Sequence, residues 1–318
     1  SALLLPTAVH SQILYWAAPV NGLGNRDGAW SPTIPNWSPF PGAPASMSWS
    51  NNGNAIAYFT NPEGATVNTS TLIRLRGIYS DTVAPVTITG APPLTFNGAA
   101  SITVVNVPLF INSTITNLGG ILTKSGTGLL AIGGSVTTNA LIIQEGLVSL
   151  SGGNLVNSAE VRNSSVLIMD DSDTISKYTQ SSGVLTGSGT LTATNGATLS
   201  SGAIAGKLSA NTTVNGDVEV SGTIGGGHRK GSPRTLHPPG ASPPTLIDIA
   251  AGAELVNASG KLDAKETSVN NLGTLTMGAD DTIHGYDQGI GGELKGARTL
   301  TVDKAAFLDG GTVGGKLL

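Results

Sequence analysis

From about residue 82 onward, the chain is a succession of short runs in which apolar and polar residues alternate. Runs such as VTIT (86–89), SVLIM (165–169) and TLTM (274–277) are three to five residues long and are bounded by Gly, Asn or Ser. Alternation with a period of two predicts strands with one buried face, and the Gly and Asn residues predict turns between them. No window of about 11–18 residues has the period of an amphipathic helix. The pattern therefore predicts an all-β protein.

Two pairs of segments repeat this pattern at nearly the same separation. Residues 189–208 match residues 298–317 at nine of twenty positions, and residues 161–180 match residues 269–288 equally well. The separations are 109 and 108 residues, which corresponds to five units of about 20–22 residues. One strand–turn unit cannot bury its apolar face, whereas stacked units cover one another. We therefore predict a parallel β-solenoid over residues 81–318, with Leu, Ile and Val inside and Thr and Ser outside.

The N-terminal part of the chain has a different composition. All four tryptophans fall between residues 15 and 59, among Pro, Asn and Gly residues that favour turns. This predicts a turn-rich head with a small aromatic core, and we assign residues 12–80 to a head that leads into the solenoid. The tryptophans are Trp16, Trp30, Trp37 and Trp49.

Residues 1–11 form a separate apolar segment. Val9 and Ser11 are small enough for the cleavage site of a secretory signal, so the segment is interpreted as the remnant of a signal peptide. The alternative is a short apolar strand that covers the first coil.

Residues 225–245 interrupt the alternating pattern. The segment contains five prolines, which cannot donate to a sheet ladder, together with His228 and His237. It is predicted to be a loop inserted between two coils. Two interpretations stay open: a tolerated insertion, or a recognition loop carried by a rigid scaffold.

Composition narrows the range of functions. Charged residues make up 11 % of the chain, less than half the usual share of about 25 %, and the net charge is −4. No basic stripe is visible, so a nucleic-acid partner is not expected. The absence of cysteine excludes disulfides and thiolate metal sites. No apolar run approaches the length of about 18 residues that a membrane-spanning helix needs.

Residues 119–150 carry a recognisable motif, GGILTKSGTGLLAIGGSVTTNALIIQEGLVSL. The segment resembles the passenger-associated transport repeat of autotransporter passenger domains. The usual N-x-Y-x-G between the two halves of that repeat is replaced by GGSVTTN. The matching positions are Gly119, Gly120, Leu122, Lys124, Gly126, Gly128, Leu130, Ile132 and Gly133 in the first half and Ile143, Gly146 and Leu150 in the second.

The resemblance implies a right-handed parallel β-helix that is secreted and displayed on the surface of a diderm bacterium. In an autotransporter the passenger is followed by an outer-membrane β-barrel translocator, which would lie outside this chain. The implied partner is a cell-surface or extracellular carbohydrate or protein.

Candidate chemistry is sparse. Asp170, Asp171 and Asp173 form the densest acidic cluster, with Asp280 and Asp281 at the related place in the second copy. A structural turn, a Ca²⁺ site and a catalytic carboxylate pair are three interpretations of it. The aromatic residues of the solenoid are too few for an evident sugar track, and Tyr178 and Tyr286 recur in register, which favours a packing role. The sequence contains no G-x-S-x-G, H-E-x-x-H or P-loop motif.

We therefore assign no catalytic, cofactor-binding or metal-binding residue. The favoured function is that of a secreted, adhesin-like structural protein without catalytic activity. One alternative is a carbohydrate-active β-helix enzyme, either a polysaccharide lyase or a hydrolase. Another is a solenoid that assembles end to end into filaments through unpaired coil edges.

Overall fold

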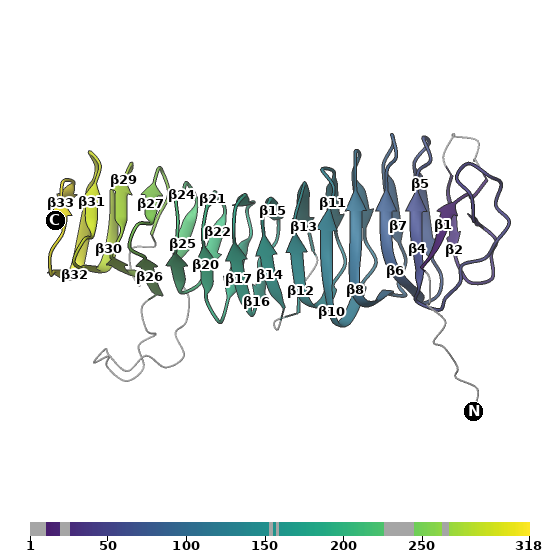
Figure 1. Ribbon diagram of the computed structural model, residues 1–318, viewed down its shortest axis with the longest axis horizontal. Coiled ribbons are helices and arrows are strands. Elements are labelled where there is room, and N and C mark those ends of the chain that lie inside the picture. The colour runs from purple at the N-terminus through teal and green to yellow at the C-terminus, as the bar shows by residue number, and fades with distance from the viewer. Residues whose placement is uncertain (1–10, 20–25, 153–154, 157–158, 226–244, 263–266) are drawn as a thin grey trace, which may run out of the picture. The chain divides into compact units, whose positions relative to one another are not determined.

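The computed structural model describes residues 11–19, 26–152, 155–156, 159–225, 245–262 and 267–318 (Figure 1). Every regular element in these ranges is a β-strand, which confirms the predicted all-β class. The chain divides into two compact units, residues 1–139 and 140–318, which are described separately. The predicted signal remnant (1–11) lies outside the described residues except for Ser11. The predicted loop (225–245) lies outside them except for its first and last residues.

Unit 1 is a stack of coils whose strands alternate between two sheets. All neighbouring strands are parallel except β1 and β3, which are antiparallel. The first sheet has the order β3 (Trp37–Ser38), β1 (Gln12–Trp16), β4 (Ala55–Phe59), β6 (Ile73–Ser80), β8 (Leu94–Val104) and β10 (Ile115–Ser125). The second has the order β2 (Gly28–Trp30), β5 (Ala65–Thr69), β7 (Val86–Thr89), β9 (Leu109–Ile111) and β11 (Leu129–Ile132).

Unit 2 continues the same plan and adds a third, four-stranded sheet. Its strand pairs are all parallel, as predicted for a solenoid. The first sheet contains β12 (Val136–Ile143), β14 (Glu160–Asn163), β17 (Lys177–Gln180), β20 (Ala197–Leu199), β23 (Thr212–Val214), β26 (Thr245–Ile249), β28 (Thr267–Asn271), β30 (Asp281–Gln288), β32 (Thr299–Leu308) and β34 (Lys316–Leu317). The second contains β13 (Leu147–Leu150), β15 (Val166–Met169), β18 (Val184–Thr186), β21 (Gly202–Ile204), β24 (Val218–Val220), β27 (Glu254–Asn257), β29 (Thr274–Met277), β31 (Glu293–Lys295) and β33 (Thr312–Val313). The third contains β16 (Asp173–Ile175), β19 (Thr190–Ala193), β22 (Lys207–Ser209) and β25 (Thr223–Gly225).

The register of the strands explains the sequence repeat. Val161 and Val269, which are related by the 108-residue offset, lie in one inward ladder and are separated by five coils, as predicted. The five coils are unequal, spanning 17, 19, 15, 35 and 22 residues, and the longest contains residues 226–244. The predicted length of 20–22 residues is therefore an average. The ladder runs Val161, Tyr178, Ala197, Thr212, Ile247 and Val269.

The interior is built mainly by alternation of inward and outward side chains along the strands. In β5, for example, Ala65, Val67 and Thr69 are buried, whereas Thr66 and Asn68 are exposed. Because each coil repeats this alternation in register, buried Leu, Ile and Val side chains stack along the unit, and each fully buried one contributes about 1.5–3 kcal/mol. The outward side chains, which are mostly polar, therefore remain available to contact other molecules.

The four tryptophans form the predicted aromatic core. Trp30 and Trp37 are completely buried, and Trp16 and Trp49 are 1 % and 2 % exposed. The ring centroids of Trp37 lie 5.0 Å from Trp16, 5.0 Å from Trp30 and 4.7 Å from Trp49. The parallel pairing typical of the solenoid is present in this part of the chain too, because β1 pairs with β4 and β2 pairs with β5. The residues between 12 and 80 thus contain solenoid strands as well as the aromatic cluster.

Candidate functional site

The segment that carries the autotransporter resemblance (119–150) runs from β10 to β13, and its first half, in β10 and β11, belongs to unit 1. Leu122, Leu130 and Ile132 point inward and are at most 1 % exposed. Lys124 is fully buried, and its Nζ donates to the carbonyl oxygens of Ser125 (2.9 Å) and Gly126 (2.6 Å). The lysine thus satisfies backbone carbonyls at the end of β10, so its place in the motif is accounted for by structure.

A buried polar network accounts for part of the first sequence copy. Asn163 Nδ2 donates to the hydroxyl of Tyr178 at 3.1 Å, and that hydroxyl donates to Gln180 Oε1 at 2.7 Å. Burial raises the pKa of Tyr178 above its ordinary value, although the bond from Asn163 opposes the shift. Tyr178 is therefore neutral at physiological pH and acts as a packing and hydrogen-bonding residue.

The second copy builds the same network. Asn271 Nδ2 donates to the Tyr286 hydroxyl at 2.9 Å, which donates to Gln288 Oε1 at 2.8 Å. Burial again raises the pKa of the tyrosine. The recurrence of these residues therefore reflects a requirement of the interior.

The three carboxylates of the predicted acidic cluster accept hydrogen bonds from different donors. Asp170 Oδ2 accepts from Ser149 Oγ at 2.7 Å, and Asp171 Oδ2 accepts from the Gly152 amide at 2.7 Å. Asp173 accepts from the amides of Leu155 (2.6 Å) and Thr174 (2.8 Å). The geometry thus favours the structural-turn interpretation of the cluster. Within the described ranges, no three His, Asp or Glu side chains are grouped as a metal site would require.

Asp281 repeats the role of Asp173. It accepts from the amides of Leu262 (2.7 Å) and Thr282 (2.9 Å), as Asp173 does five coils earlier. Burial raises the pKa of Asp173, while the two amide bonds oppose that shift. Each copy thus uses one carboxylate, buried for Asp173 and half-buried for Asp281, to bind two backbone amides.

Replacing Asp173 with Asn is expected to lower the free energy of unfolding by about 1–3 kcal/mol, because the Leu155 and Thr174 amides bind different oxygens and Asn has an NH₂ donor in place of one of them. The pKa of Asp173 is higher in the folded protein than in the unfolded chain. The stability that this carboxyl group contributes is therefore greatest below about pH 4 and falls as the pH rises through the raised pKa. The variant should lose this pH dependence. Urea unfolding at acidic and neutral pH measures both effects, with exposed Asp217→Asn as the control. Equal unfolding curves for the two variants would contradict the assignment.

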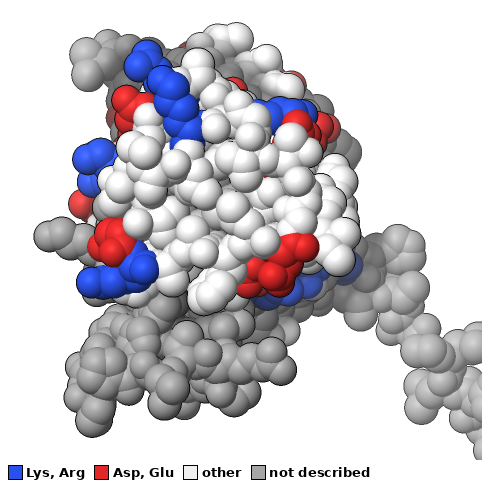
Figure 2. All heavy atoms as spheres, turned by 90° about the vertical axis from the view of Figure 1, so that its left-hand side faces the viewer, with Lys and Arg blue, Asp and Glu red and all other residues white. Residues whose placement is uncertain are grey.

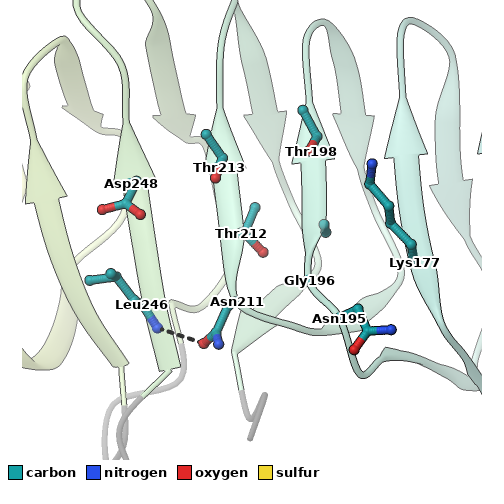
Figure 3. A pocket seen from close by; sticks show the side chains of 10 residues that line it. Lys177, Asn195, Gly196, Thr198, Asn211, Thr212, Thr213, Leu246 and Asp248 are labelled. Atoms are coloured by element: carbon teal, nitrogen blue, oxygen red, sulfur yellow. Dashed lines mark hydrogen bonds between the residues drawn. The ribbon is translucent and has the colours of Figure 1, made fainter. Parts of the chain in front are cut away.

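A shallow polar hollow lies on the outer face of the first sheet of unit 2 (Figure 3). Thr198, Thr213 and Asp248 line it from the neighbouring strands β20, β23 and β26, and Lys177 lies on β17 at the other side. The hollow has a volume of about 220 Å³. Asn211 also lines it and accepts a bond from the Leu246 amide at 3.2 Å.

The groups that line the hollow suit hydrogen bonding to a polar ligand better than hydrolysis of a glycoside. Hydroxyl, amide, ammonium and carboxylate groups line it, and all can hydrogen-bond a polar ligand. Glycoside hydrolysis ordinarily needs two carboxyl groups about 5–10 Å apart. Asp248 is the single acidic residue among the residues that line the hollow. Its Oδ1 accepts from Asn270 Nδ2 at 3.1 Å.

A row of outward tyrosines, which the sequence analysis missed, lies on the first sheet of unit 1. Tyr15, Tyr58 and Tyr79 are in register on β1, β4 and β6 and are half-buried. The Tyr15 and Tyr58 ring centroids are 5.3 Å apart, and those of Tyr58 and Tyr79 are 4.7 Å apart and nearly parallel, at 21°. These residues fall in the part that the sequence assigns to the head (12–80), outside the predicted solenoid.

A polar pair lies beside Tyr79 at the end of this row. The Asp81 carboxylate is near the Tyr79 hydroxyl, and Asn106 Nδ2 donates to Asp81 Oδ1 at 2.6 Å. Burial, and then the charge of Asp81, raise the pKa of Tyr79. The arrangement brings an aromatic ring, a carboxylate and an amide together on an outer face.

No family model, curated protein or solved structure matched the chain. The geometry of the described residues and the resemblance of residues 119–150 are therefore the features that bear on function. Among the described residues there is no helix with the length and apolar character needed to cross a membrane.

The last coil of unit 2 presents apolar side chains to solvent. Phe307, Leu308 and Leu318 are 62 %, 52 % and 78 % exposed. In the end-on view, the centre of this face is uncharged and the charged residues lie at its rim (Figure 2). The face is therefore a surface on which another β-coil or protein can pack.

Proposed function

We propose that the chain is a non-catalytic, adhesin-like β-helix, displayed outside the cell as a passenger of the autotransporter type. The observation that carries the proposal is the in-register repetition of polar side chains on the outer faces. Thr179, Thr198 and Thr213 form one such outward row in unit 2. Repeated weak contacts from a rigid scaffold produce avidity without one deep pocket. The motif in residues 119–150 supports the secreted, surface-displayed part of the proposal.

The adhesive function is tested with beads that carry the purified chain at several surface densities. The expected result is adhesion to immobilised extracellular glycoproteins or polysaccharides that falls more steeply than the density of the chain, because several contacts act together. No reducing or unsaturated sugar ends should be released from the polysaccharides. Adhesion no better than that of albumin-coated beads would refute the adhesive function, and release of sugar ends would favour the enzyme alternative.

Surface display is tested separately by antibody labelling of intact cells of the source organism. An antibody raised against the chain should label intact and permeabilised cells equally. Labelling that requires permeabilisation would contradict display.

Assembly between copies is the second candidate function, and the exposed apolar face of the last coil supports it. Two copies packed through Phe307, Leu308 and Leu318 would cover side chains that are exposed in one copy. Sedimentation velocity at increasing concentration distinguishes assembly from a monomeric adhesin. A single species of one-chain mass at all concentrations would exclude assembly through this face.

A further inference from the structure

We propose that Tyr79, Asp81 and Asn106 form a binding site for a sugar unit of a neutral, extended glycan. This inference deepens the proposed adhesive function and rests on it, because it names a ligand class for one outer face. The site lies wholly within unit 1.

The first observation is the free face of the Tyr79 ring. Tyr58 covers one side of the ring, with centroids 4.7 Å apart. On the other side the outward row continues with Thr103 and Ser125, whose hydroxyl oxygens are 2.9 Å apart. These side chains are small, and within the described part of unit 1 no second ring contacts Tyr79 from that side. One aromatic face thus borders a hydroxyl-lined floor.

The second observation is the polar group beside that face. The Asp81 carboxylate accepts from Asn106 Nδ2 at 2.6 Å. A carboxylate has about four acceptor positions, so Asp81 retains capacity for ligand hydroxyls, and the bond from Asn106 holds it in place. A pyranose ring has an apolar C–H face and an edge of hydroxyl groups. The ring face and the carboxylate–amide pair match those two surfaces.

The third observation is the apolar row next to the tyrosines. Ile13 is 39 % exposed and is in register with Ile56, and Gly77 follows in the same row. Gly77 is buried, and a Cβ there would lie 2.9 Å from the Ser101 carbonyl oxygen of the next coil, so the apolar row ends in flat backbone at this position. An extended, flat chain of β-1,4-linked sugars can lie across such a strip more readily than a branched or coiled one.

The local charges argue against a basic peptide as the occupant. Arg74 and Arg76 are exposed on β6, the strand that carries Tyr79, and would repel a basic peptide that followed this strand. A proline-rich peptide ordinarily docks in an aromatic-lined groove. The close stack of Tyr58 and Tyr79 leaves no such opening between their rings. A neutral glycan meets neither obstacle.

The test is titration of the full chain with hexasaccharides of β-1,4-linked N-acetylglucosamine and of β-1,4-linked glucose. We expect saturable binding of at least one, with little change up to roughly 0.5 M salt because the ligand is neutral. Tyr79→Ala and Asp81→Ala should each weaken binding by about tenfold or more, since each removes a ring face or a charged acceptor. Tyr79→Phe keeps the ring and should lose less affinity. Asp217→Ala removes an exposed carboxylate of unit 2, serves as the control and should bind as the wild type does.

Melting curves establish that each variant is folded, and Asp81→Ala carries the test if Tyr79→Ala is not. Absence of binding by both hexasaccharides, or unchanged affinity in folded Tyr79→Ala and Asp81→Ala, would overturn the inference. An equal loss of binding in Asp217→Ala would mean that the loss does not come from this site and would likewise overturn the inference. Bead adhesion without hexasaccharide binding would reject this site alone, whereas hexasaccharide binding without bead adhesion would reject the adhesive function.

Discussion

Replacing Gly183 with alanine is expected to lower the free energy of unfolding of unit 2 by about 3 kcal/mol or more. Gly183 has a φ of +84°, a conformation that other residues rarely adopt. A Cβ placed there would lie only 1.8 Å from the carbonyl oxygen of Ser165 in the preceding coil. That oxygen accepts the Val184 amide at 2.7 Å, so it cannot move away without loss of a hydrogen bond between coils.

Gly252→Ala is the matched control for this prediction. Gly252 has nearly the same φ, +79°, but a Cβ there would meet nothing within 4 Å. The control should therefore cost only the backbone term of about 1–2 kcal/mol. Thermal or urea unfolding measures both variants. If they were equally destabilised, close stacking of the coils would not be the reason that glycine occupies position 183.

Replacing Trp37 with alanine should destabilise unit 1 by about 3–5 kcal/mol. Trp37 is completely buried and contacts the rings of Trp16, Trp30 and Trp49, so its removal leaves a cavity in the aromatic cluster. The change should lower the melting temperature of unit 1 and weaken its near-ultraviolet circular dichroism.

Phe40→Ala serves as the control for Trp37, because Phe40 is nearby in sequence but 67 % exposed. It should change stability by no more than about 0.5 kcal/mol. A Trp37→Ala protein that melts like the wild type would mean that the tryptophans do not form the interior of unit 1.

The repeat in the sequence predicts the stacked fold because it reflects positions that point inward. Asn163, Tyr178 and Gln180 recur as Asn271, Tyr286 and Gln288, and both sets make the same buried bonds. The separation of the duplicated residues therefore gives the correct number of coils between them. Individual coil lengths cannot be predicted in this way, since turns differ in length while the strands stay in register.

The outward surface is much harder to predict. Tyr15, Tyr58 and Tyr79 point to solvent, whereas Tyr178 and Tyr286 are buried in the same kind of strand. Direction depends on the phase of the alternation, and the buried neighbours Trp16 and Phe59 set that phase in β1 and β4. The dipeptides Tyr15-Trp16 and Tyr58-Phe59 carry this signal, because a buried residue in a strand directs its neighbour outward. The bond between Asp81 and Asn106 joins successive coils and requires the register to be known.

The central claim is that the related segments of unit 2 lie on one rigid face, five coils apart. Because the chain has no cysteine, spin labels can be attached to pairs of introduced cysteines and their separation measured by pulsed electron paramagnetic resonance. Arg162 and Asn270 are in one outward row at five coils, and Asp287 lies one coil further. At about 4.8 Å per coil, the structure predicts narrow separations of about 24 Å for Arg162–Asn270 and about 29 Å for Arg162–Asp287. Broad distributions, or a second distance no longer than the first, would contradict it.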